Sequence, residues 1–93
     1  VVRENTFKGK GDYHIYANDP AKITHNVFEV ESGAAGAVYL TSSASGSEII
    51  NNTFVGIDEG SYDAIKLSSS ITSVDIRNNI FYNFLLHLNS YCF

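Results

Sequence analysis

The chain has 93 residues, of which 44% are hydrophobic and 17% charged, a balance typical of one small globular domain that excludes a disordered segment. Its formal net charge of −4 argues against a nucleic-acid or anionic-lipid partner, because proteins that track phosphates need clustered cations. No apolar run approaches the roughly 20 residues that a membrane-spanning helix requires. The single cysteine, Cys92, excludes an internal disulfide and a metal site built from cysteines alone.

A short motif recurs four times along the chain. It reads Asn-x-Phe, at Asn5–Phe7, Asn26–Phe28, Asn52–Phe54 and Asn79–Phe81. With 9 Asn and 6 Phe in the chain, random placement would give roughly 0.6 such pairs. A β-branched aliphatic residue stands three positions before each Asn, at Val2, Ile23, Ile49 and Ile76. Chance would produce those four matches about once in a thousand sequences, so the chain is predicted to be a repeat protein.

The spacing of the motif predicts the kind of repeat. Successive motif asparagines are 21, 26 and 27 positions apart, about the length of one turn of a β-solenoid. The chain is therefore predicted to form a single solenoid unit over residues 1–93. Its turns are expected near residues 2–22, 23–48, 49–75 and 76–93, the last one incomplete.

A second repeated element lies between the motifs, with the pattern apolar, variable, apolar, small polar. Its four copies are Ile15–Asn18, Val38–Thr41, Ile65–Ser68 and Leu86–Asn89. Alternation with a period of two predicts a strand with one buried face, and the small polar residue predicts a following turn. Each solenoid turn is thus expected to hold three strands: this one, one that leads to the motif Asn, and a short one that carries the Phe.

The third repeat shows this order most clearly, with Ile65–Leu67, a serine-rich turn, Val74–Arg77 and Ile80–Phe81. It resembles the right-handed parallel β-helix repeat of the pectate-lyase-like (pectin lyase-like) superfamily, and the likeness covers essentially the whole chain. The resemblance implies an all-β, right-handed parallel β-helix of about 3.5 turns, expected to be a fragment of a longer solenoid. It implies no single function, because the superfamily holds lyases, hydrolases, epimerases, adhesins and non-catalytic proteins.

Equivalent residues of successive turns are predicted to lie one strand spacing, about 4.8 Å, apart and so to form ladders. The motif phenylalanines would form an interior aromatic stack. The motif asparagines would form a corner ladder, because Asn tolerates left-handed backbone and its amide can donate and accept along the stack. The asparagine ladder is expected at Asn5, Asn26, Asn52 and Asn79.

The middle position of each second-element strand is predicted to point outward and to form one row across the solenoid. The row would consist of Tyr16, Tyr39, Lys66 and His87. These side chains suit an extended acidic polysaccharide, because tyrosines can lie against sugar rings and Lys66 can pair with a uronate carboxylate. The alternative interpretation is that long side chains cover a flat sheet without binding anything.

The resemblance implies that activity lies on this face, flanked by loops at residues 9–13, 29–36 and 56–63. The third loop carries Asp58, Glu59 and Asp63. Carboxylate oxygens suit calcium, so a calcium site is one interpretation of these residues and a solvated acidic loop is the other. No cofactor is otherwise expected.

The sequence leaves catalysis open. Lyases of the superfamily use Lys or Arg as the base that removes a proton from a uronic acid, so the resemblance implies this role for Lys66, with His87 beside it. A glycoside hydrolase would need two carboxylates facing each other, and the predicted row has none. A polysaccharide lyase or epimerase is therefore favoured over a hydrolase, and a non-catalytic adhesion or structural solenoid is the alternative.

Two arginines and two histidines outside the row are interpreted as residues without a functional role. Arg3 and Arg77 occupy matching outward positions and are interpreted as solubilising, whereas His14 and His25 lack metal-ligand spacing and are interpreted as surface or turn residues. The outer turns would leave strand edges unpaired, so self-association or continuation of the solenoid through its ends is expected. A polysaccharide ligand implies a secreted or cell-surface protein.

Overall fold

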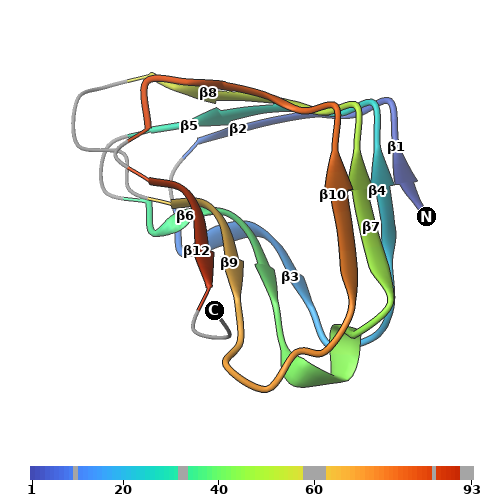
Figure 1. Ribbon diagram of the computed structural model, residues 1–93. Helices are drawn as coiled ribbons and strands as arrows, with labels where there is room; N and C mark the ends of the chain where they lie inside the picture. The colour runs from blue at the N-terminus through green and yellow to red at the C-terminus, as the bar shows by residue number, and fades with distance from the viewer. Residues whose placement is uncertain (10, 32–33, 58–62, 85, 91–93) are drawn as a thin grey trace.

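The structure, a computed structural model, describes residues 1–9, 11–31, 34–57, 63–84 and 86–90, the last range by its backbone (Figure 1). Its strands form three sheets of four. Sheet A contains β1 (Val2–Arg3), β4 (Lys22–Thr24), β7 (Ser47–Ile50) and β10 (Val74–Arg77). Sheet B contains β2 (Thr6–Gly9), β5 (Val27–Val30), β8 (Thr53–Gly56) and β11 (Ile80–Tyr82). Sheet C contains β3 (Tyr13–Ala17), β6 (Gly36–Leu40), β9 (Asp63–Leu67) and β12 (Leu86–Ser90).

The strands are distributed among the sheets in a regular order. The chain passes through sheets A, B and C in turn, four times, and all neighbouring strands pair in parallel. One short 3-10 helix, η1 (Ser42–Ala44), is the sole helical element in the described ranges. Figure 1 shows the three sheets as three sides around a shared interior. The predicted all-β class is confirmed, and the parallel arrangement is compatible with a β-helix-like solenoid.

The corner between sheets A and B depends on one residue with left-handed backbone in each repeat. These residues have φ between 56° and 60° and are Glu4, His25, Asn51 and Asn78. Each stands immediately before a motif asparagine, so the prediction that the motif asparagines themselves are left-handed is wrong. His25 is an exposed turn residue, as predicted.

The motif asparagines form a continuous hydrogen-bonded ladder beside this corner. The Oδ1 atom of Asn52 accepts from the backbone N–H of Asn26 at 2.9 Å and from its Nδ2 at 3.1 Å. The Nδ2 of Asn52 donates to the Ile23 carbonyl at 2.9 Å. Asn26 and Asn52 are each only 1% exposed, so their amides satisfy each other where water cannot. The predicted asparagine ladder is present.

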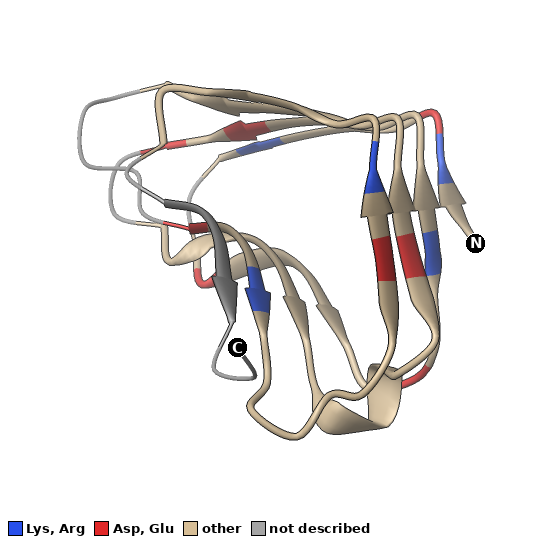
Figure 2. Ribbon diagram, viewed as in Figure 1, with Lys and Arg blue, Asp and Glu red and all other residues tan. Residues whose placement is uncertain are grey.

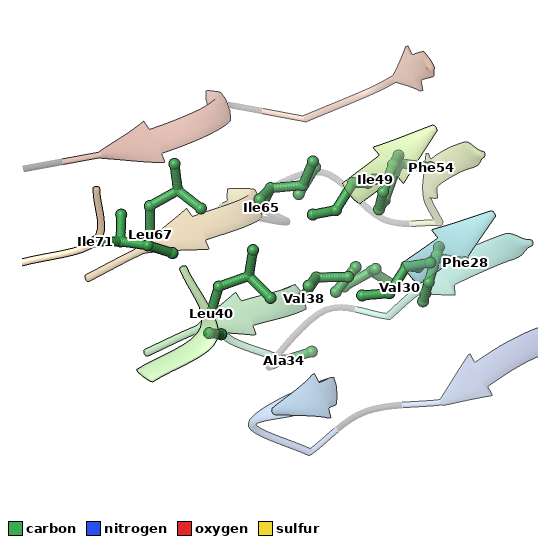
Figure 3. Packing of buried hydrophobic residues seen from close by; sticks show 14 residues of the cluster. Phe28, Val30, Ala34, Val38, Leu40, Ile49, Phe54, Ile65, Leu67 and Ile71 are labelled. Carbon is green, nitrogen blue, oxygen red and sulfur yellow. The ribbon is translucent and has the colours of Figure 1, made fainter. Parts of the chain in front are cut away.

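The interior is packed by ladders of equivalent apolar side chains. The rings of Phe28 and Phe54 lie 4.8 Å apart and 6° from parallel, and both side chains are fully buried. Phe7 extends this stack beyond Phe28 at 4.9 Å, and Phe81 extends it beyond Phe54 at 5.0 Å. Figure 3 shows Phe28 and Phe54 one above the other at one end of the core. Parallel pairing in register thus turns a sequence repeat into an apolar core.

A glycine is required where β6 meets β9. A Cβ atom on Gly36 would collide with the carbonyl oxygen of Asp63 and lie 2.9 Å from the Tyr13 ring. Gly36 is also the register partner of both Tyr13 and Asp63. The absence of a side chain therefore lets three strands of sheet C approach each other at this point.

Replacement of Gly36 should separate these strands. We expect Gly36→Ala to lower the free energy of unfolding by about 1–3 kcal/mol, because the added methyl meets backbone that cannot rotate away. Equilibrium unfolding in guanidinium chloride measures the change. Gly46→Ala is the comparison variant without crowding, because a Cβ atom at Gly46 would meet no atom within 4 Å. Its φ of 92° disfavours alanine, so any loss in this variant reports backbone strain and not a clash. Unchanged stability of Gly36→Ala would contradict the close approach.

The outer faces of sheets A and B carry charged residues in pairs (Figure 2). Lys22 lies 3.8 Å from Glu48 on sheet A, and Lys8 lies 3.5 Å from Glu29 on sheet B. Arg3 and Arg77 share one column of sheet A through Thr24 and Ile50, as predicted from sequence. No helix in the described part of the chain is long and apolar enough to cross a membrane.

Candidate functional site

The outer face of sheet C carries the side chains predicted to bind a ligand. Strand register places Tyr16 opposite Tyr39 and Tyr39 opposite Lys66, so the three residues form one row across β3, β6 and β9. The residues on either side of Tyr39, Val38 and Leu40, are fully buried. This alternation turns the three side chains outward, and we call them the sheet C row.

The fourth predicted member of the row is not in register. Strand β12 pairs Leu88 with Ile65 and Asn89 with Lys66, so the backbone of His87 stands two positions away from the row. The prediction that His87 continues the row is therefore wrong, and Asn89 holds that register position. A shift of two residues leaves strand alternation unchanged, which is why the apolar pattern of Leu86–Asn89 did not reveal it.

The aromatic rings of the row contact each other face to face. The rings of Tyr16 and Tyr39 lie 4.9 Å apart and 15° from parallel, and Nζ of Lys66 lies 5.6 Å from the Tyr39 ring centroid. Tyr13, which the sequence analysis did not select, adds an edge contact to Tyr39 at 5.3 Å. Both faces of Tyr39 are thus covered, and its ring cannot lie flat against a sugar. Tyr16 is 60% exposed on the outermost strand and is the residue of the row with an open aromatic surface.

The row combines three kinds of contact in one line. Tyr16 offers an apolar ring surface, Tyr39 a ring edge with a hydroxyl group, and Lys66 a cationic ammonium group held over an aromatic ring. A cation placed on a ring face is attracted by the negative quadrupole of the ring. The row is therefore partly organised before any ligand arrives, and its charge suits an anionic partner.

The acidic residues predicted beside the row are only partly described. Asp63 begins β9, three residues before Lys66 on the same strand. Asp58 and Glu59 lie outside the described residues. Within the described ranges, no group of three His, Cys, Asp or Glu side chains could hold a metal ion. The calcium site remains a prediction that depends on Asp58 and Glu59.

His14 lies inside the fold and not at a surface or turn position, so its sequence interpretation is wrong. Its ring stacks on Phe7 at 6.0 Å and on Phe28 at 6.1 Å, and its Nε2 atom is 3.1 Å from the Gly9 carbonyl. The equivalent position in the next repeats, at Ala37 and Ala64, is fully buried, so His14 occupies an inward position of sheet C. His14 therefore lies beside the Phe7–Phe28 pair of the phenylalanine stack and takes no part in the sheet C row.

Comparisons of the chain with protein-family models, curated proteins and solved structures found no match. The sheet C row therefore carries the functional proposal by its own chemistry. That chemistry is one exposed aromatic ring, one aromatic hydroxyl group and one ammonium group, aligned across parallel strands.

Proposed function

We propose that this chain forms a right-handed parallel β-helix of the pectate-lyase-like kind that binds an extended acidic polysaccharide along the sheet C row. The observation that carries the proposal is the register of Tyr16, Tyr39 and Lys66 on adjacent parallel strands. A polysaccharide ligand places the protein outside the cell or on its surface.

The spacing of the row fits an elongated ligand. Neighbouring strands are about 4.8 Å apart, so a chain that crosses the strands meets one side chain of the row after another. A compact ligand would contact only one or two of them. The row therefore favours a polymer over a small molecule, with binding shared among several sugar units.

Lys66 is the residue of the row that suits an acidic chain. Its Nζ atom lies 5.6 Å from the centroid of the Tyr39 ring. A uronate carboxylate approaching Lys66 would add an ion pair to a cation already positioned by an aromatic ring.

Binding of this kind is expected to be weak. The Tyr16 ring contact and the Lys66 ion pair each contribute on the order of 1 kcal/mol at an exposed site, and association entropy opposes both. β-Elimination or epimerisation by Lys66 is the catalytic extension of the proposal, with His87 as the predicted neighbour. The displacement of His87 from the row favours binding over catalysis.

The second candidate function is a non-catalytic adhesion or structural solenoid. Face-to-face stacking of Tyr16 and Tyr39 favours it, because rings that cover each other stabilise the sheet and leave less surface for sugar. The two functions differ in whether Lys66 and Tyr16 contact a ligand.

Titration of the protein with alginate, pectate and glycosaminoglycan oligosaccharides tests the binding proposal. We expect amide shifts in NMR spectra to concentrate on β3, β6 and β9. Lys66→Gln should weaken binding about five-fold, the equivalent of about 1 kcal/mol, and Tyr16→Ala should weaken it by a similar factor. Absorbance of unsaturated uronate in the same samples would report lyase activity.

Two matched variants control for nonspecific effects. Lys22→Gln removes an exposed cation from sheet A, and Tyr82→Ala removes a 67% exposed tyrosine from sheet B. Neither should change the affinity. Shifts confined to sheets A or B would move the site elsewhere, and no shifts with any oligosaccharide in a folded sample would support the structural function.

A further inference from the structure

Tyr16 and Tyr39 are identical side chains in register on neighbouring parallel strands. Their rings lie 4.9 Å apart and 15° from parallel. Identical side chains that leave parallel strands in register place equivalent atoms side by side. The ring carbons next to the hydroxyl group of Tyr16 therefore lie beside their counterparts in Tyr39.

This ring contact joins two repeats within the chain. It follows from the pairing of β3 with β6, and both rings stand on the outer face of sheet C. A further strand beside β3 would lie in the plane of the sheet and would leave the contact in place.

The two rings differ in how they meet the solvent. Tyr16 is 60% exposed, so an oxidant in solution reaches its ring directly. Tyr39 is only half-buried, but Nζ of Lys66 lies 5.6 Å from its ring centroid and Tyr13 makes an edge contact at 5.3 Å. These neighbours and Tyr16 together shield the Tyr39 ring from the tyrosines of other molecules.

The composition of the chain directs oxidation to its tyrosines. The chain contains six Tyr and one Cys, with neither Met nor Trp. Cysteine and methionine are common targets of oxidants, and here Cys92 is the sole residue of these two types. Once Cys92 is blocked, the phenol groups are the main sites of one-electron oxidation.

We propose that Tyr16 and Tyr39 are a modification site, at which a haem peroxidase with hydrogen peroxide forms a covalent dityrosine link within one chain. Each phenol loses one electron and one proton and becomes a phenoxyl radical. The two unpaired electrons form a carbon–carbon bond between the carbons next to the two hydroxyl groups. Each ring then loses the hydrogen on its bonded carbon as a proton, and each oxygen regains a proton. The pair loses two hydrogen atoms in total, and one hydrogen peroxide is reduced to two water molecules.

Contact in the folded chain makes this coupling efficient. Two reacting groups that are held together react in an effectively unimolecular step. A radical formed on Tyr16 therefore meets Tyr39 before it meets a tyrosine of another molecule.

Tyr13 is a poorer partner for Tyr39, although the two rings touch. Tyr13 is in register with Gly36 and not with Tyr39, so the equivalent ring carbons do not lie side by side. The two ring planes meet at 74°, which sets an edge against a face. The geometry thus selects Tyr16 from the two tyrosines of β3.

The link would change the sheet C row. It would hold β3 on β6 and fix the Tyr16 ring against Tyr39, which removes the open ring surface that a sugar would contact. Oxidation is therefore expected to weaken polysaccharide binding. This consequence rests on the proposed function, whereas formation of the link does not.

Oxidation of the folded protein with a haem peroxidase and hydrogen peroxide, after alkylation of Cys92, tests the proposal. We expect dityrosine fluorescence in the monomeric fraction, an intact mass lower by two hydrogen atoms and a linked peptide pair that contains Tyr16 and Tyr39. The yield per chain should be equal at low and high protein concentration, because the coupling is intramolecular. A folded monomer without dityrosine, dityrosine confined to covalent dimers, or a link that maps to other tyrosines would overturn the proposal.

Phenylalanine variants provide the matched test, because each keeps its ring and removes only the phenol hydroxyl group. Tyr16→Phe and Tyr39→Phe should each lower the dityrosine yield of the monomer about ten-fold. Tyr13→Phe should leave the yield unchanged, as should Tyr82→Phe, which alters a 67% exposed tyrosine on sheet B. A link that persists in either row variant, or that disappears in either control, would contradict the assignment. Circular dichroism confirms that each variant is folded.

The cross-linking result and the sugar titration are read separately. Failure of the titration would leave the expected dityrosine link unaffected, and absence of the link would leave the titration unaffected. If both succeed, the linked monomer should bind the oligosaccharides more weakly than the untreated protein does.

Discussion

Replacing Phe54 with alanine should lower the free energy of unfolding by about 3–5 kcal/mol, as for other large-to-small changes in well-packed cores. The Phe54 ring is fully buried between Phe28 at 4.8 Å and Phe81 at 5.0 Å. Both neighbours are held by their own strands and cannot close the gap, because the strand spacing is fixed by backbone hydrogen bonds. Equilibrium unfolding in guanidinium chloride, followed by far-UV circular dichroism, measures the loss.

Two further variants separate the effect of the stack from that of general apolar burial. Phe54→Leu keeps most of the buried volume and should cost less than half as much as Phe54→Ala. Phe7→Ala removes a half-buried ring at the end of the phenylalanine stack and should also cost less than half as much as Phe54→Ala. A loss below about 1 kcal/mol for Phe54→Ala would show that Phe54 is not enclosed by the stack.

Replacing Asn52 with alanine should be similarly damaging, by about 3–5 kcal/mol, although it removes only a small polar side chain. The variant would leave the Asn26 N–H and Nδ2 without their acceptor and the Ile23 carbonyl without its donor. Each buried polar group left unpaired costs about 1–3 kcal/mol. The same unfolding experiment applies, and hydrogen exchange at the Asn26 amide should accelerate.

Asn5→Ala is the matched control for the ladder. Asn5 is exposed at the end of the ladder, where its Nδ2 donates to the Arg3 carbonyl at 3.0 Å. Its backbone N–H would still donate to Asn26, so the loss should stay within about 1 kcal/mol. Equal losses for the Asn5 and Asn52 variants would refute the idea that burial makes the ladder important.

The repeat itself could be read from the sequence because in-register stacking requires equivalent residues at equivalent positions. Four copies of one motif predicted both the phenylalanine stack and the asparagine ladder. The same periodicity predicted that Tyr16, Tyr39 and Lys66 would share a row, because an alternating strand has only two faces. Each interior ladder requires the same type of residue in every repeat, so the repeated local pattern is enough to identify the ladder.

Register in the last strand depends on the tertiary structure. Apolar and polar residues alternate over Leu86–Asn89, so moving this segment by two residues keeps the same positions on the same face of the strand. The local pattern favoured pairing Leu88 with Leu67, and the structure instead pairs Leu88 with Ile65 and Ser90 with Leu67. The backbone position of His87 therefore lies outside the row, two residues before that of Asn89 on the same strand.

The orientation of side chains at the site is also a tertiary property. An outward tyrosine can present its face or its edge, and contact between Tyr16 and Tyr39 at 4.9 Å decides in favour of mutual stacking. His14 lies against the rings of Phe7 and Phe28, contacts that a lone histidine in the sequence did not indicate. The sequence by itself determined which residues repeat and therefore stack. The tertiary structure decided which surfaces remain open to a ligand, because ring orientation depends on neighbours that lie one turn away in space and more than 20 residues away in the chain.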